Sequence, residues 1–141
     1  MLRGTLIHPE ILEVLGRAGH GSQVLIADGN YPFSTGANPR ARRVFLNVRP
    51  GLLSATDVLE VLAGAIPLEA ASVMVPDGPE PPIFEEFRRL LPAGMRLDPL
   101  ERFAFYAAAR GEDVALVIAT GEQRVYANIL LTIGVIPPPG A

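Results

Sequence analysis

Cysteine and tryptophan are absent from this chain of 141 residues, and histidine occurs only twice. Without cysteine, neither a disulfide framework nor a thiolate metal site can form. With His8 and His20 as the whole histidine complement, a histidine-rich metal site of the H-E-x-x-H kind is excluded as well. The sequence also has no G-x-x-x-x-G-K-[ST] phosphate loop and no G-x-G-x-x-G motif. We therefore expect no metal and no cofactor.

Positive charge and long apolar runs are also scarce. The formal net charge is −3, and the nearest approach to a basic patch is the short cluster of Arg40, Arg42 and Arg43. Nucleic acid binding requires a larger positive surface, so no nucleic acid partner is expected. No apolar stretch is long enough to span a bilayer, and Met1 to Glu10 lack a signal-peptide pattern. We expect a cytoplasmic protein with no membrane partner.

Hydrophobic residues are plentiful: they make up 49% of the chain, against 19% charged residues. A chain of this length suffices for one domain with a substantial core. Two explanations for the apolar excess remain open at this point. One is a sheet buried on both faces, and the other is a large interface between subunits.

Helical and strand patterns alternate along the chain. Helices are predicted from Pro9, from near Ser54, over 82–91 and over 99–110, and strands over 23–27, 71–75, 95–97, 114–119 and 125–131 with a further piece to 136. Residues 30–50 are predicted to be irregular. This alternation predicts an α/β sheet covered on both faces, in a single domain of residues 1–141. The proline-rich end, 137–141, is predicted to be a flexible tail.

Two glycine-flanked residues in the first third of the chain are candidates for chemistry. His20 lies between Gly19 and Gly21, and its pKa near neutrality suits proton transfer. It also fits an ordinary surface loop. Asp28 follows a buried strand, where ligands gather in α/β folds, and its carboxylate could bind sugar hydroxyls or orient a histidine. An Asp-Gly turn explains the same residue equally well.

Two further polar pairs come from the last third of the chain. Arg102 and Tyr106 share a face of the predicted helix, either as ligand-binding groups or on a solvent-exposed or interface face. Phe103 is predicted to be in the core. On a strand over 125–131, Tyr126 and Asn128 would point to one side, which suits a polyol ligand or a wet edge strand.

The order of four separated motifs carries more information than any one of them. His-Pro-Glu-Ile-Leu at 8–12, Gly-His-Gly at 19–21 and Ile-Ala-Asp-Gly-Asn-Tyr-Pro at 26–32 resemble the start of the ribose pyranase/fucose mutarotase family. Arg-Phe-Ala-Phe-Tyr at 102–106 is similar to a segment of its fucose branch. Thr-Gly-Glu followed by Tyr-Ala-Asn-Ile-Leu-Leu, within 120–131, resembles the closing signature of the family.

The resemblance implies a three-layer α/β/α sandwich assembled into rings, typically homodecamers, with active sites at subunit contacts. It implies that His20 donates a proton and that Tyr106 assists proton transfer. It implies sugar-binding roles for Asp28, Arg102, Tyr126, Ala127 and Asn128. Residues 33–50 and 76–98 match no pattern of the family.

The predicted function is a cofactor-free mutarotase that interconverts the α and β anomers of a free, fucose-like monosaccharide. Ring opening requires one proton to be removed and another donated, and His20, Asp28 and Tyr106 are the predicted catalytic groups. The alternative within the same class is a D-ribose pyranase. The alternatives from other classes are a non-catalytic sugar-binding protein linked to transport and a purely structural oligomer.

Overall fold

The computed structural model describes residues 1–140, and across them six strands form one sheet in the order β2-β5-β1-β6-β3-β4. The strands are β1 (Gln23–Ala27), β2 (Arg42–Phe45), β3 (Leu68–Met74), β4 (Leu97–Leu100), β5 (Val114–Ala119) and β6 (Ile129–Ile133). The central strands β1 and β5 are almost entirely buried, as expected for strands covered on both faces.

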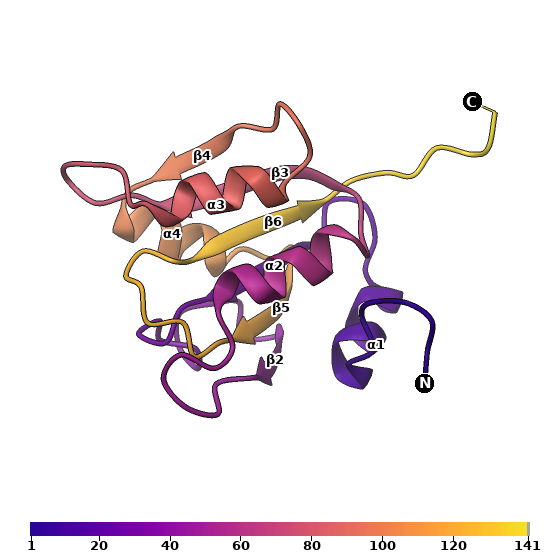
Figure 1. Ribbon diagram of the computed structural model, residues 1–141, viewed down its shortest axis with the longest axis horizontal. Coiled ribbons are helices and arrows are strands. Elements are labelled where there is room, and N and C mark those ends of the chain that lie inside the picture. The colour runs from indigo at the N-terminus through magenta and orange to yellow at the C-terminus, as the bar shows by residue number, and fades with distance from the viewer. Residues whose placement is uncertain (141) are drawn as a thin grey trace.

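Helices cover both faces of the sheet. They are α1 (Pro9–Arg17), α2 (Ala55–Ala63), α3 (Ile83–Leu90) and α4 (Arg102–Ala109). Apolar side chains of α1, α2 and α3 join one core cluster with the strands, and those of α4 join a second cluster with the segment after β1. Figure 1 shows α2 and α3 in front of the sheet and α4 behind it. The predicted three-layer α/β/α sandwich is confirmed.

The direction of β6 determines where the site forms. This strand lies between β1 and β3 and runs antiparallel to both, whereas the other neighbouring strands are parallel. Its first residue, Ile129, is therefore opposite Ile26 and Val73, close to where β1 and β3 end. The loop before β6 thus meets the carboxyl ends of the parallel strands, which is where α/β folds place their ligands.

Local signals correctly predict the starts of α1 and α2. The Ser54 hydroxyl accepts a hydrogen bond from the Asp57 backbone N–H at 3.0 Å, and the Asp57 carboxylate accepts one from the Ser54 backbone N–H at 3.1 Å. This reciprocal pair is the predicted capping box at the start of α2. His8 similarly caps α1, because its Nδ1 accepts a hydrogen bond from the backbone N–H of Ile11.

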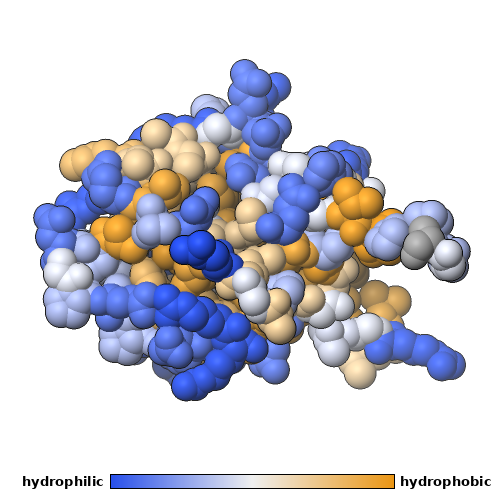
Figure 2. Space-filling model, turned by 90° about the horizontal axis from the view of Figure 1, so that it is seen from above, coloured by the Kyte–Doolittle hydropathy of each residue, from blue (hydrophilic) through white to orange (hydrophobic). Residues whose placement is uncertain are grey.

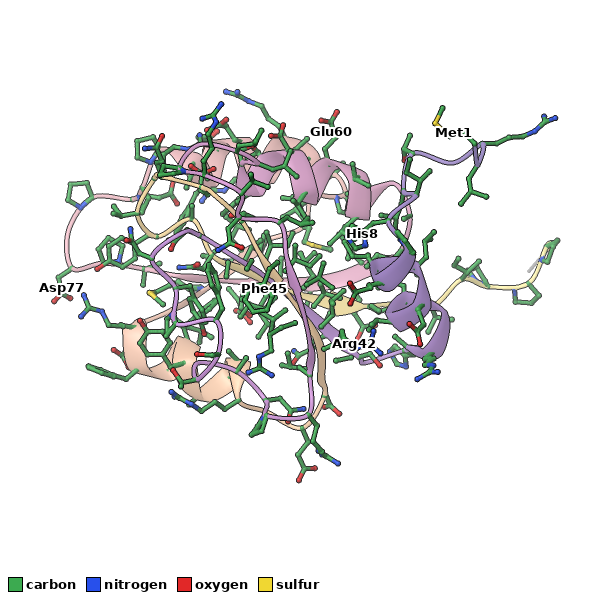
Figure 3. The ribbon with its side chains drawn as sticks, turned by 90° about the horizontal axis from the view of Figure 1, so that it is seen from below. Met1, His8, Arg42, Phe45, Glu60 and Asp77 are labelled. Atoms are coloured by element: carbon green, nitrogen blue, oxygen red, sulfur yellow. The ribbon has the colours of Figure 1, made fainter. Side chains whose placement is uncertain are left out.

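The structure corrects the strand predictions at four places. β3 covers 68–74 rather than the predicted 71–75. β2 falls in the stretch predicted to be irregular; it is a four-residue edge strand with two arginines, so its pattern is weak. Arg42 of this strand reaches the Glu13 carboxylate of α1 at 3.4 Å, on the same side of the molecule (Figure 3). Residues 97–100 pair with β3, so α4 begins only at Arg102 with Glu101 as its N-cap. The last strand covers 129–133 rather than 125–131, and residues 134–136 add no strand.

The prediction that Phe103 is in the core was also wrong. Its side chain is 71% exposed, whereas Phe105 is 0% exposed and packs with the second core cluster. With the helix starting at Arg102, the face that meets the sheet carries Phe105 and Ala109. In the predicted tail, residues 137–140 form no helix or strand, and Ala141 lies outside the described residues.

Within residues 1–140, no helix combines the length and the apolar character needed to cross a membrane.

Candidate functional site

A cavity of about 190 Å³ lies at the edge of the sheet where β1 and β3 end and β6 begins. The loop after β1, the end of β3, helix α4 and the turn before β6 all contribute to its wall. Its lining residues are Asp28, Asn30, Tyr31, Met74, Arg102, Tyr106, Val125, Tyr126 and Asn128. The structure therefore brings together, from three distant parts of the sequence, most of the predicted site. Ala127 is fully buried between Tyr126 and Asn128.

Asp28 is the most constrained polar residue of this site. Its carboxylate accepts hydrogen bonds from the backbone N–H groups of Asn30, at 3.0 Å, and Ala127, at 3.2 Å. The Asn128 side-chain amide donates to the same carboxylate at 3.2 Å, and its Oδ1 accepts from the Asp28 backbone N–H at 2.7 Å. Burial raises the pKa of Asp28, and these hydrogen bonds offset part of that effect. Asp28 therefore fixes both its own turn and the loop before β6.

Tyr126 has a backbone conformation that residues other than glycine rarely adopt. Its φ angle is 57°, in the left-handed region, and it lies in a turn rather than on the predicted strand. The expected alternation of Tyr126 and Asn128 on one strand face was therefore wrong. Both side chains still line the cavity, because the turn, instead of a strand, brings them there. Left-handed non-glycine residues cluster at ligand sites, where surrounding contacts keep them in place.

Arg102 and Tyr106 lie one turn apart on α4 and both face the cavity, as their spacing predicts. The Arg102 guanidinium is 3.5 Å from the Tyr126 hydroxyl, which links α4 to the turn before β6. The Tyr106 ring packs edge-on against Tyr31, with 5.4 Å between ring centroids. The guanidinium of Arg110 lies 5.9 Å from the centre of the Tyr106 ring. Two cationic and three phenolic groups therefore converge on or beside the cavity.

Tyr31 and Met74 are cavity residues that the sequence reasoning missed. Burial raises the pKa of Tyr31, and its hydroxyl donates a 2.6 Å hydrogen bond to the Gly36 carbonyl oxygen. A side chain at Gly36 would overlap the Tyr31 ring and Pro32, so the loop requires glycine there. Tyr31 belongs to the same short motif as Asp28, which is a signal that could have identified it. Met74 has no local signal, since only the sheet register places it beside the site.

His20 is the predicted site residue that the fold does not bring to the cavity. It precedes β1, whereas Asp28 follows that strand. At about 3.3 Å per residue, the two residues are separated by roughly the length of the strand, on the order of 15 Å. The His20 Nε2 lies instead 2.9 Å from the Glu69 carboxylate, and both side chains are exposed. Glu69, rather than Asp28, is thus the partner of this histidine in the single chain.

A second cavity, of about 440 Å³, lies next along the same edge of the sheet and shares Asn30 with the first. It is formed by the loop after β2 and the segment from Thr120 to Gln123. It contains no residue of the predicted catalytic set. In the part of the chain that the structure describes, no three His, Asp or Glu side chains are grouped so that they could hold a metal ion.

The fold and the cavity define a small α/β protein with a polar, polyol-sized pocket at a sheet edge. The profile of the family described as "RbsD / FucU transport protein family" matches residues 1–136. This chain belongs to that family.

Individual relatives cover most of the chain. A fucose mutarotase from Danio rerio is 34% identical in an alignment of 147 positions that covers 95% of this chain and 92% of the relative. A D-ribose pyranase from Variovorax paradoxus is 33% identical, in an alignment that covers 96% of this chain and 98% of the relative. The crystal structure of the fucose mutarotase from Streptococcus pneumoniae in complex with L-fucose superimposes with a TM-score of 0.79 and 27% identity, over 93% of this chain and 95% of that one.

Proposed function

We propose that this chain is a cofactor-free mutarotase that interconverts the α and β anomers of a free, fucose-like monosaccharide. The observation that carries the proposal is the convergence of Asp28, Arg102, Tyr106, Tyr126 and Asn128 on one cavity of about 190 Å³. That volume lies below the range of about 300–1,000 Å³ typical of drug-sized ligands, as expected for one sugar. The similarity to fucose mutarotases supports the choice of sugar.

The reaction needs only proton transfer. A base removes the proton of the anomeric hydroxyl while an acid protonates the ring oxygen, so that the ring opens to the free aldehyde. Rotation about the bond to the aldehyde carbon and reclosure on its other face give the second anomer. When the ring closes, the acid and the base take back the protons that they exchanged with the sugar. The sugar is neither oxidised nor reduced. An acid and a base held on either side of the ring therefore suffice.

The cavity residues divide into binding and supporting groups. Arg102, Tyr126 and Asn128 supply a guanidinium, a hydroxyl and an amide for the sugar hydroxyls. Tyr106 is placed to move one of the two protons. Asp28 is already engaged by three donors of this chain, so we assign it chiefly to holding Asn128 and the backbone at Ala127. Its remaining acceptor capacity is available to a sugar hydroxyl.

His20 is the second proton carrier, and we infer that it comes from another copy of this chain. The cavity of the same chain lies at the opposite end of β1 from His20. The His20 imidazole is exposed and paired with the Glu69 carboxylate at 2.9 Å. A carboxylate in this position orients the imidazole ring. Each cavity would then be completed by the His20–Glu69 pair of a neighbouring copy.

Exposed apolar side chains support assembly into a ring, for which we propose a homodecamer. Phe45, Phe103 and Val125 are each at least 60% exposed, and Val125 lies on the rim of the cavity. Val135 and Ile136 are also exposed, and Figure 2 shows apolar atoms, in orange, at several places on the face that it draws. Burial of such side chains against other copies would stabilise the ring. A cytoplasmic location stays a prediction from the sequence.

Magnetisation-exchange NMR tests the function directly. The anomeric protons of L-fucose, D-galactose and D-ribose are followed with and without protein, and transfer of saturation between the α and β signals is measured. We expect protein-dependent transfer that is fastest for L-fucose. Faster exchange between pyranose and furanose forms of D-ribose would favour the pyranase instead, which the similarity to the Variovorax paradoxus enzyme also supports. Binding of sugar without any transfer would overturn the assignment in favour of a binding protein.

A further inference from the structure

The loop before β6 is anchored, on the N-terminal side of Tyr126, by an ion-pair cluster that the proposed mechanism does not use. Glu122 and Arg124 form this cluster, and neither residue lines the 190 Å³ cavity. We propose that Glu122 and Arg124 are positioning residues that hold Tyr126 in its left-handed conformation, with its hydroxyl at the sugar. The inference rests on the proposed function only in taking Tyr126 as a sugar-binding residue.

Glu122 is the buried half of the cluster. Its side chain is 5% exposed, and its carboxylate accepts hydrogen bonds from the Arg124 backbone N–H at 2.9 Å and the Ala55 backbone N–H at 3.1 Å. Burial acts to raise the pKa of Glu122, but the hydrogen bonds from Arg124 and Ala55 outweigh it, so that the pKa lies below its ordinary value. Glu122 is therefore a charged group that ties the loop to the first turn of α2.

Arg124 completes the cluster from the exposed side. Its Nε and one Nη donate to the two oxygens of Glu122 at 3.0 and 2.9 Å, which is the two-pronged geometry that only arginine provides. Its other Nη pairs with Glu86 of α3. The backbone between residues 122 and 124 is thereby fixed against two helices at once.

Tyr126 lies between this cluster and a second anchor. On its other side, the Ala127 backbone N–H donates to the Asp28 carboxylate at 3.2 Å, and Asn128 pairs with Asp28 through both its side-chain atoms. Only Val125 and Tyr126 are left between the two anchors. A non-glycine residue in the left-handed region is strained and persists only where several contacts hold it there. The Glu122–Arg124 pair before Tyr126 and the Asp28 contacts after it together hold the backbone in this conformation.

The test compares Arg124→Met with Arg88→Met as a matched control. Arg88 lies on α3, the helix that Arg124 reaches through Glu86, and it pairs with two carboxylates, those of Glu80 and Glu85, away from the cavity. We expect Arg124→Met to raise KM for the exchanged sugar about five- to tenfold, the worth of one hydrogen bond, with kcat changed less than about twofold. Arg88→Met should leave both constants unchanged. Arg124→Lys restores the charge without the two-pronged contact, so its KM should stay raised even where thermal stability recovers.

A double-mutant cycle shows whether the cluster acts through Tyr126. In a Tyr126→Ala background, Arg124→Met should change KM less than about twofold, because the side chain that it positions is gone. An equal increase in both backgrounds would overturn the proposal and leave the cluster a purely structural feature.

Amide hydrogen exchange tests the positioning without any sugar. The Ala127 N–H should lose protection at least about tenfold in Arg124→Met and keep it in Arg88→Met, since its bond to Asp28 depends on the loop conformation. Unchanged protection would overturn the proposal even for an active enzyme. If wild-type protein exchanged no sugar while Ala127 lost protection as expected, the proposed function would fail and the positioning would stand.

Discussion

If each site is shared between two copies of the chain, mixing two inactive variants should recover exchange activity. His20→Ala removes the proposed acid–base group but leaves the cavity intact, and Arg102→Ala removes a cavity residue but leaves His20 intact. Both residues are exposed, so neither substitution should unfold the chain. Loss of a general acid–base group costs about 10²–10⁴-fold in rate. Loss of a charged hydrogen bond to the sugar costs about 1.5–3 kcal/mol, or roughly 10–150-fold.

The recovered activity follows from counting sites. When the two variants are unfolded together, mixed in equal amounts and refolded, each cavity carries Arg102 with a probability of about one half. The copy that supplies the histidine to that cavity carries His20 with the same probability. Because every contact in a symmetric assembly is equivalent, about a quarter of all sites are intact, whatever the number of subunits. The mixture should therefore reach about a quarter of wild-type exchange, far above either variant alone.

The assay is saturation transfer between the anomeric protons of L-fucose, at equal total protein for each sample. The same variants mixed without unfolding serve as the control, and their activity should stay near that of the single variants if subunits exchange slowly. A refolded mixture no more active than the average of its two components would refute a shared site. His20 would then have to act within its own chain, which the length of β1 does not allow, or not at all.

Three further predictions concern stability. Phe105→Ala should cost about 3–5 kcal/mol of the free energy of unfolding in urea, whereas Phe103→Ala should cost less than about 0.5 kcal/mol; a large loss for Phe103 would contradict its exposed position. Gly121→Ala should cost at least about 2 kcal/mol by the same measurement, because a side chain there would overlap backbone carbonyl oxygens of the 49–52 loop; wild-type stability would contradict that close approach. Glu122 has a lowered pKa in the folded chain, so its stabilisation is present above its ordinary pKa of 4.5 and is lost as the pH falls through the folded value. Glu122→Gln should therefore reduce stability at pH 7 and weaken the acid-side slope of stability against pH, and an unchanged slope would contradict the assignment.

Features set by neighbouring residues were predictable from the sequence. The capping box of Ser54 and Asp57 and the proline at the start of α1 act within one turn, so their signals are local and specific. The apolar runs of β1 and β5 are equally direct, because strands buried on both faces need no alternation. The layered fold follows from placing these elements in order.

Features set by distant contacts were not predictable from local pattern. The turn at Tyr126 exists because Asp28, about a hundred residues earlier, holds the backbone that follows it. Helical spacing correctly placed Arg102 and Tyr106 on one face, but the predicted core residue of this helix was Phe103, whereas Phe105 meets the sheet. The order of motifs predicted His20 as part of a site, whereas only the fold reveals that the cavity lies at the other end of β1.

The central place of β6 has a consequence for how the chain comes together during synthesis. In the sheet, β2, β5 and β1 form one hydrogen-bonded group and β3 and β4 another, and β6 alone pairs with both. This strand follows all the others in the sequence, so the two groups have no sheet contact until residues 129–133 are made. The turn that carries Tyr126 is made just before them. A ribosome-bound chain halted before residue 129 should therefore have two separate half-sheets and no sugar pocket, and the pocket should form together with the closure of the sheet.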